Sequence, residues 1–299
     1  MLPHRLPLVV ALACLVAPAS AGEAPGFGVT GTVIRHEAFA SREVEPRNVD
    51  VWLPPGYDGD GSERYAVIYM HDGQNLFDPS TSYGGVDWAI DEILAGLIAS
   101  DGVRPAIVVG IWNAGKARYA EYMPQKALPS ATNERGRLAS DRYLKFIVDE
   151  LKPFIDANYR TLPGRDDTFI MGSSMGGLIS AYAVSEHPEV FGGAACVSTH
   201  WPAENGVVID YLAANLPEPG AHRLYFDFGT ATLDAGYEPY QQRMDEILRR
   251  RGYVAGEDWI TRKFDGAEHS EKAWRLRAGV PLRFLLRLHL AVPAAAGSQ

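Results

Sequence analysis

The chain has 299 residues, of which 46% are hydrophobic and 22% charged, so it can bury a sizeable core as an ordinary globular protein. Its formal net charge is −9 and no basic stretch is interleaved with aromatic residues, which argues against nucleic acid or an anionic membrane surface as a partner. No Cys and His cluster has zinc spacing, so we expect no metal site.

The first 21 residues have the pattern of a secretory signal peptide. Arg5 precedes an apolar run over residues 6–16, and small residues end at Ala21, where we expect cleavage. The apolar run is too short to span a bilayer, so a membrane anchor or a buried N-terminal helix is the weaker alternative. We therefore expect an exported protein, periplasmic or secreted, with no membrane contact after the signal is removed.

Cleavage would remove Arg5 and Cys14, which changes the formal charge to about −10 and leaves Cys196 as the sole cysteine. One cysteine cannot form an internal disulfide, so the mature chain must be stable through core burial. Cys196 lies in an apolar run and is expected to be a small buried hydrophobe.

Strand-like and helix-like runs alternate along the rest of the chain, without an internal repeat. Apolar, β-branched runs bounded by turn residues predict strands, and apolar residues at helical spacing predict helices. The predicted strands cover residues 28–40, 48–53, 65–70, 106–112, 167–171, 193–198, 223–228 and 259–264, and the predicted helices cover residues 86–98, 143–159, 175–187, 208–216, 240–251 and 271–290.

This alternation predicts an α/β fold with a mainly parallel central sheet and helices on both faces. The first two strands are predicted to form an N-terminal antiparallel pair. No linker rich in proline, glycine and serine divides the chain, so residues 22–290 are expected to form one domain and residues 291–299 a disordered tail. The oligomeric state stays open.

A G-x-S-x-G sequence, Gly172-Ser173-Ser174-Met175-Gly176, lies between the predicted strand 167–171 and the predicted helix 175–187. This is the arrangement of the nucleophile elbow of an α/β-hydrolase. A strand that turns at once into a helix strains the serine backbone, and side chains at the flanking glycines would collide there. The turn exposes the hydroxyl above the sheet, so we expect Ser174 to be the nucleophile of an acyl transfer.

A serine hydroxyl attacks a carbonyl poorly unless a base removes its proton. His269 follows the predicted strand 259–264 and precedes the last helix, which is where an α/β-hydrolase carries its base. The other histidines considered are less favourably placed along the chain; they are His71, His187, His222 and His289.

The third catalytic member should be a carboxylate between the serine and the histidine in the chain. Asp234 is the preferred residue, in the loop after the predicted strand 223–228. Asp227, within that strand, and Glu238, later in the loop, stay possible. The order Ser174, Asp234, His269 is that of an α/β-hydrolase.

An oxyanion hole needs two backbone N–H donors. One is expected from Met175, the residue after the nucleophile. The other is expected from the loop that follows strand 65–70, where Gln74 or Gly73 would donate, because glycine permits a close approach of the backbone.

Several polar and aromatic residues follow strands at the same sheet edge as Ser174 and could bind the acyl or alcohol part of a substrate. They are Trp112, Asn113, Arg118, Glu121, His200 and Trp201. Packing within loops is the alternative for each. Trp88 and Trp274 lie on helix-like stretches and are expected to be core residues.

The chain resembles the esterase D-like or "putative esterase" group of α/β-hydrolases, which includes feruloyl and acetyl-xylan esterases, siderophore trilactone esterases, S-formylglutathione hydrolase and the mycolyltransferases. The resemblance covers roughly residues 28–290. The blocks that carry it are residues 69–78, reading YMHDGQNLFD, the segment from Asn113 through Arg118 to Glu121-Tyr122-Met123-Pro124, the elbow at 172–177, residues 187–192, and residues 266–274.

The resemblance implies a hydrolase with a small lid or none, which uses Ser174, Asp234 and His269 without a cofactor. Several relatives place the aspartate nearer the strand end, at the position of Thr232 here. The identity of the acid therefore stays open among Asp234, Asp227 and Glu238.

We therefore expect an exported serine carboxylic-ester hydrolase that acts through an acyl-serine intermediate. The candidate esters are siderophore lactones, acylated or feruloylated saccharides and small aliphatic esters; export argues against the cytosolic S-formylglutathione. One alternative is an acyltransferase with the same triad. Another is a non-catalytic binding protein on a hydrolase scaffold.

Overall fold

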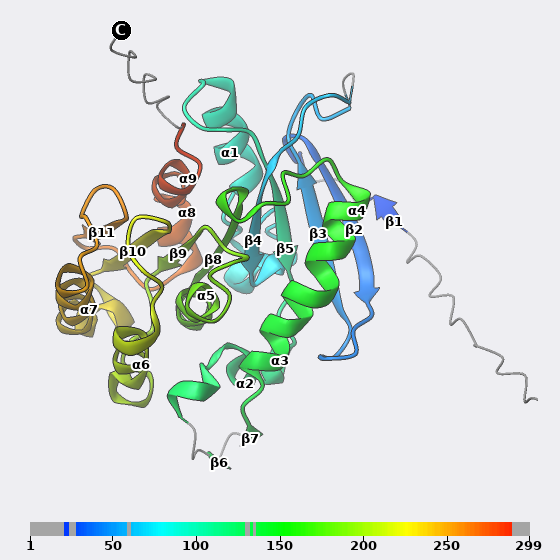
Figure 1. The fold of residues 1–299 in the computed structure, drawn as a ribbon. Helices are drawn as coiled ribbons and strands as arrows, with labels where there is room; N and C mark the ends of the chain where they lie inside the picture. Colours follow the sequence, from blue (N-terminus) through cyan, green and yellow to red (C-terminus); the bar gives the residue numbers. More distant parts are fainter. Residues whose placement is uncertain (1–20, 24–27, 59–60, 129–131, 134–135, 289–299) are drawn as a thin grey trace, which may run out of the picture.

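The computed structural model describes residues 21–23, 28–58, 61–128, 132–133 and 136–288 (Figure 1). Residues 1–20 of the predicted signal peptide and the predicted tail at residues 291–299 lie outside the described residues. Ala21, after which cleavage is predicted, lies in the short first strand.

Within the described residues, nine strands form one sheet in the order β1-β2-β3-β5-β4-β8-β9-β10-β11. Their bounds are β1 Ala21–Glu23, β2 Thr32–Phe39, β3 Arg47–Leu53, β4 Ala66–His71, β5 Ala106–Ile111, β8 Thr168–Ser173, β9 Gly193–Val197, β10 Arg223–Gly229 and β11 Trp259–Phe264. The pairs from β1 to β5 are antiparallel, and the pairs from β5 through β4 to β11 are parallel. The predicted fold class and the N-terminal antiparallel pair, β2 with β3, are therefore confirmed.

The helices of the described chain are α1 Ile90–Ala99, α2 Arg118–Tyr122, α3 Ser140–Lys145, α4 Lys152–Asn158, α5 Met175–Glu186, α6 Val207–Asn215, α7 Glu238–Arg250, α8 Glu271–Arg275 and α9 Gly279–Leu285. A π-helical segment, Phe146–Leu151, joins α3 to α4, so the predicted helix 143–159 is continuous and begins three residues earlier. The five-residue α2 and a two-stranded ribbon, β6 Thr132–Asn133 with β7 Gly136–Arg137, were not predicted.

One predicted helix, residues 271–290, is wrong: the chain forms α8 and α9, separated by a turn at residues 276–278. Pro281 accounts for the break. In a continuous helix its nitrogen would face the carbonyl of Arg277, but proline has no N–H to donate and its ring collides with that carbonyl. The carbonyl of Arg277 accepts instead from the N–H of Val280 at 2.9 Å.

The sheet is buried on both faces, and each face has its own apolar cluster (Figure 1). Along β4, Val67 and Tyr69 belong to the cluster beneath α3 to α7, and Ile68 and Met70 belong to the cluster beneath α1, α8 and α9. All four are at most 1% exposed, as expected for a strand whose alternate side chains meet helices on opposite faces. Helices therefore cover both faces, as predicted.

Cys196 is fully buried in β9, as predicted, and burial raises the pKa of its thiol. Among the described residues, no helix combines the length and apolar character needed to cross a membrane.

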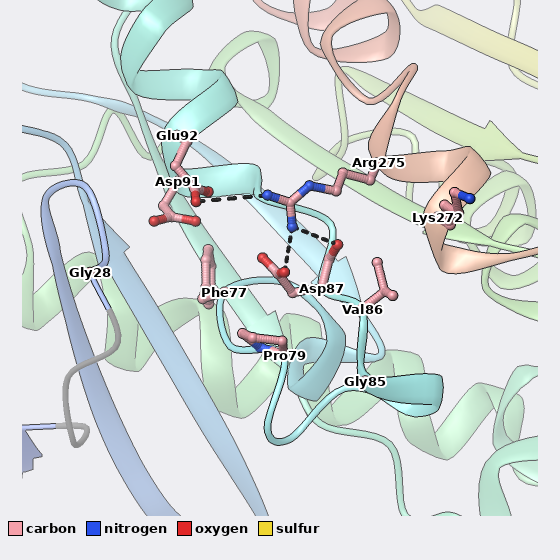
Figure 2. Close-up of a pocket in the computed structure, with 10 residues that line it drawn as sticks. All are labelled: Gly28, Phe77, Pro79, Gly85, Val86, Asp87, Asp91, Glu92, Lys272 and Arg275. Carbon is pink, nitrogen blue, oxygen red and sulfur yellow. Dashed lines mark hydrogen bonds and ion pairs between the residues drawn. The ribbon is translucent and has the colours of Figure 1, made fainter.

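Asp87, Asp91 and Glu92 form an acidic cluster at the start of α1, and Arg275 on α8 contacts this cluster (Figure 2). Arg275 on α8 donates to the Asp87 carboxylate at 2.5 Å and lies 4.0 Å from the Glu92 carboxylate. Asp91 is 1% exposed; its Oδ2 accepts from the Thr30 N–H at 2.9 Å, and its Oδ1 has no partner within the described residues. This contact matters for the site because α8 also carries Trp274.

Burial, together with neighbouring Glu92, raises the pKa of Asp91 to about 7 from an ordinary 3.8. The folded chain thus holds this proton more tightly than the unfolded chain. The resulting stability is present at low pH and is lost as pH rises from about 4 to about 7. Asp91→Asn keeps an acceptor for Thr30 and removes the charge. At pH 8 it should raise the free energy of unfolding by about 1–2 kcal/mol, and at pH 4 by much less.

Urea unfolding of both proteins at the two pH values measures this difference. A gain of equal size at pH 4 and pH 8 would contradict the assignment of the buried proton to Asp91.

Candidate active site

Ser174 occupies the turn between β8 and α5 with φ 58° and ψ −119°. A positive φ is uncommon for a residue with a side chain and signals local strain. The backbone is held there because the Ser174 N–H donates to the carbonyl of Val197 on the neighbouring β9 at 2.9 Å, while its own carbonyl accepts from the N–H of His200 at 3.1 Å. The strand-turn-helix context predicted from the sequence is thus present.

The flanking glycines differ in how tightly they are packed. A Cβ at Gly172 would lie 2.9 Å from His71 Cδ2 and 3.0 Å from the backbone of Gly176, both too close. A Cβ at Gly176 would lie 3.5 Å from its nearest neighbour, His71 Cβ, which is ordinary contact. The predicted collision therefore holds for Gly172 and not for Gly176.

His269 lies between β11 and α8, and its Nδ1 is 2.5 Å from Oδ1 of Asp234. Its backbone N–H donates to Thr232 Oγ at 2.8 Å, and its ring meets the Trp274 ring edge-on with centroids 4.9 Å apart. Thr232 is the position where several relatives place the acid. In this chain the Thr232 side chain binds the backbone N–H of His269, and the Asp234 carboxylate binds its ring.

Asp234 lies in a 3₁₀ turn, Thr232–Gly236, that follows β10. Its second oxygen, Oδ2, accepts from the Ser198 hydroxyl at 2.5 Å and from the Gly229 N–H at 2.6 Å. Burial alone would raise the pKa of Asp234, but the hydrogen bonds from His269, Ser198 and Gly229 outweigh it and hold the pKa below its ordinary value. The carboxylate is thus ionised and fixed in orientation.

The two alternative acids lie elsewhere. Asp227 is buried in β10 and pairs with Arg277 at 3.0 Å, while Glu238, at the start of α7, pairs with Lys263 at 2.9 Å near the surface. Of the three carboxylates considered, the structure brings Asp234 to the His269 imidazole.

Ser174 and His269 line the same cleft, which has a volume of about 430 Å³. Its other lining residues are Asp72, Gln74, Asn75, Tyr83, Asn113, Arg118, Ser173, Glu271 and Trp274. The chain segments that meet here follow β4, β5, β8 and β11, whose carboxyl ends lie at one edge of the sheet.

Of the expected oxyanion donors, Gln74 lines this cleft and Met175 directly follows Ser174 in the chain. Gln74 is in a 3₁₀ turn, Gly73–Asn75, directly after β4, and Met175 is the first residue of α5. In the described part of the chain neither N–H donates to a protein acceptor, so both can serve a ligand. Gly73 has another reason to be glycine: a Cβ there would lie 2.4 Å from the backbone of Gly110 in β5.

An ion pair between Arg118 and Asp72 also lines the cleft. Arg118 donates to both oxygens of Asp72 at 2.7 Å, and the Asn113 amide donates to Asp72 Oδ1 at 2.7 Å. Burial alone would raise the pKa of Asp72, but the Arg118 guanidinium and the Asn113 amide hold it below its ordinary value. The predicted substrate-binding residues Asn113 and Arg118 thus reach the cleft, with part of their hydrogen-bonding capacity used by Asp72.

The other predicted substrate-binding residues, Trp112, Glu121, His200 and Trp201, do not line this cleft. Trp112 donates to Asp50 at 2.8 Å, Glu121 is buried against Arg47 at 2.7 Å, and Trp201 is 1% exposed and donates to Gln241 at 2.8 Å. His200 directs its Nδ1 to the Tyr237 hydroxyl at 2.5 Å. Each was predicted at the correct edge of the sheet, but its side chain contacts another protein side chain and is not among the residues that line the cleft.

Several lining residues were not predicted. Asp72 and Asn75 lie within the YMHDGQNLFD block, Ser173 within the elbow and Glu271 within the block at residues 266–274, so each had a signal in the sequence, whereas Tyr83 had none. Trp274 was predicted to be core; it is 5% exposed and also lines the cleft. Burial, followed by the charge of Asp72, raises the pKa of Glu271.

One group of carboxylates in the described chain, Asp87, Asp91 and Glu92, has oxygens within 4.8 Å of one another. The Arg275 guanidinium already lies beside two of them (Figure 2). A cation is therefore supplied by the protein itself, and the expectation of no metal stays a prediction.

Comparison with known proteins matches residues 42–276 to the family model described as "Putative esterase". The uncharacterized protein YbbA of Bacillus subtilis is 25% identical over 244 residues, 79% of this chain and 90% of that protein. An endo-1,4-beta-xylanase/feruloyl esterase of Xylanibacter ruminicola is 29% identical over 235 residues, 77% of this chain but 28% of that longer protein. A ferulic acid esterase structure from Anaeromyces mucronatus has a TM-score of 0.63 at 19% identity, covering 89% and 93% of the two chains, a likeness in fold.

The unequal packing of the two elbow glycines leads to a prediction. Gly172→Ala should lower the free energy of unfolding by about 1–3 kcal/mol, because its methyl group must displace His71 and the start of α5. The matched variant Gly176→Ala should cost less than about 1 kcal/mol, since its methyl group has room and alanine favours a helix. Denaturant unfolding of both variants tests this, and an equal loss at the two positions would contradict it.

Proposed function

Because the chain belongs to the family described as "Putative esterase" and is an ester hydrolase, we propose that it is an exported serine esterase acting through an acyl-serine intermediate. The observation that carries the proposal is the 2.5 Å contact between His269 and Asp234 beside the strained Ser174 turn, with all three residues in the predicted chain order.

In this mechanism the His269 imidazole removes the proton of the Ser174 hydroxyl, and the serine oxygen bonds to the ester carbonyl carbon. The N–H groups of Met175 and Gln74 donate to the oxyanion that forms. When the carbonyl reforms, the bond to the alcohol breaks and His269 returns its proton to the leaving oxygen. Water, deprotonated by His269, then attacks the acyl-serine carbonyl; the bond to the Ser174 oxygen breaks, His269 returns the proton to that oxygen, and the acid is released.

Asp234 would orient the imidazole and stabilise its protonated form. The hydrogen bonds that keep its pKa below the ordinary value support this role, because a carboxylate that stays ionised can balance the imidazolium charge. Because Nδ1 is held by Asp234, Nε2 is the nitrogen that would accept the Ser174 proton in this mechanism.

The cleft lining supports an ester with polar or aromatic groups. Asn113, Gln74 and Arg118 offer polar contacts, and Tyr83, which is 79% exposed, and Trp274 offer aromatic surface. We infer a feruloylated or acylated saccharide, a siderophore lactone or a small ester. A long aliphatic acyl chain would find little apolar surface here.

Ser174→Ala should lower kcat/KM for p-nitrophenyl acetate by at least about 10³-fold and abolish labelling by a fluorophosphonate probe. Ser173→Ala is the matched control, because Ser173 lines the same cleft one residue away and should keep its labelling. Formation of the free acid with water as the sole acceptor separates a hydrolase from an acyltransferase. Absence of labelling in the wild type would remove both, and would leave the non-catalytic binding protein.

Asp234→Asn should reduce kcat by about 10³ to 10⁴-fold, because the amide no longer balances the imidazolium. Glu238→Gln, which alters the alternative acid, should change kcat by less than about threefold, since its ion pair with Lys263 lies at the surface. Steady-state kinetics with one ester suffices, and the opposite order of effects would assign the acid to Glu238.

A further inference from the structure

We propose that the buried ion pair between Arg277 and Asp227 positions the catalytic acid and sets the charge that His269 meets. The inference rests on the proposed serine-esterase mechanism. Arg277 and Asp227 contact neither the Ser174 hydroxyl nor the cleft, so they act through other residues.

Ser198, the residue after β9, connects the pair to the acid. Its Oγ accepts from Arg277 Nη2 at 2.7 Å and from Trp274 Nε1 at 3.0 Å. An arginine and an indole N–H can donate but not accept, and a hydroxyl has one proton and two acceptor sites. The proton of Ser198 is therefore left for Asp234, whose Oδ2 lies 2.5 Å away. By donating to Ser198 Oγ, Arg277 thus directs the Ser198 proton toward Asp234, although Arg277 takes no part in that hydrogen bond.

Asp227 accepts hydrogen bonds from both Ser198 and Arg277. Its Oδ1 accepts from the Ser198 N–H at 2.9 Å and from Arg277 Nη2 at 3.0 Å, and its Oδ2 accepts from the Tyr225 hydroxyl at 2.7 Å. The Ser198 backbone has φ 41°, a strained conformation for serine. Asp227 thereby fixes the hydroxyl and the guanidinium that point toward Asp234.

The charges of this group also matter. The side chains of Arg277, Asp227 and Asp234 are at most 4% exposed, and Arg277 Nη2 lies 3.9 Å from Asp234 Oδ2. Two carboxylates and one guanidinium carry one net negative charge, which an imidazolium at His269 balances. Without Arg277 that imidazolium would face two buried negative charges, and His269 would hold its proton to higher pH.

Other elements present further charges to His269. Glu271 on α8 lines the cleft with it, and so do Asp72 and Arg118, whose charges pair with each other. The Tyr237 ring lies 5.7 Å away, and burial keeps its phenol neutral by raising its pKa. These groups are the same in every variant below, so a difference between variants in the titration of His269 can be attributed to the charges of Arg277 and Asp227.

The test compares Arg277→Gln, Asp227→Asn and the double variant. Arg277→Gln should move the acid limb of the kcat/KM profile to higher pH by about one unit, and Asp227→Asn should move it to lower pH by a similar amount. The double variant restores the charge count, so its limb should return close to that of the wild type. A role limited to packing α8 and α9 would change the unfolding midpoint without opposite shifts of this kind.

Arg277→Lys is the second variant, in case Arg277→Gln does not fold. Lysine keeps the positive charge but lacks the planar guanidinium that donates to Ser198 and Asp227 together. The acid limb of the kcat/KM profile should therefore stay at the wild-type pH while kcat falls about tenfold. Shifts of the two single charge variants in the same direction, no shift in either folded variant, or a shift in Arg277→Lys would each overturn the proposal.

The midpoint of the His269 imidazole titration, followed by NMR in the Ser174→Ala background, provides a readout independent of turnover. If wild-type enzyme is not labelled by a fluorophosphonate, the proposed function fails. Opposite shifts in the NMR titration would still show that the pair sets the charge at His269, and equal or absent shifts would show that it does not.

Discussion

The candidate site depends on one geometric constraint, the meeting of the carboxyl ends of parallel strands at a single edge of the sheet. Asp72 follows β4, Ser174 follows β8, Ser198 follows β9, Asp234 follows β10 and His269 follows β11. Residues as far apart in the chain as Asp72 and His269 can therefore line one cleft without any long excursion of the chain. The register of five adjacent parallel strands, fixed by burial on both faces, holds these residues relative to one another.

This constraint explains which parts of the site could be predicted. Ser174 and His269 could be placed because each belongs to a local pattern next to a strand end, and the family resemblance supported the blocks around them. Asp234 could be preferred, but not separated from Asp227 and Glu238, because all three lie near the same strand end. Ion pairs with distant residues distinguish them in the structure, because Asp227 pairs with Arg277 and Glu238 pairs with Lys263.

The direction of a side chain was the part that could not be predicted. Trp201 and Glu121 follow strands at the correct edge, yet each is buried against a partner far along the chain, Gln241 and Arg47. Ser198 and Arg277 gave no local signal, since their relation to Asp234 exists only after β9, β10 and α8 have packed. The break between α8 and α9, by contrast, follows from Pro281 and was open to prediction.

The strained backbone of Ser174 has a consequence for how this chain evolves. A glycine at φ 58° would relax the turn, and would be expected to make the fold more stable at the cost of the hydroxyl. Selection for stability alone would thus favour loss of the serine. If Ser174 is the nucleophile proposed above, the use of its hydroxyl explains why a serine is kept at this strained turn.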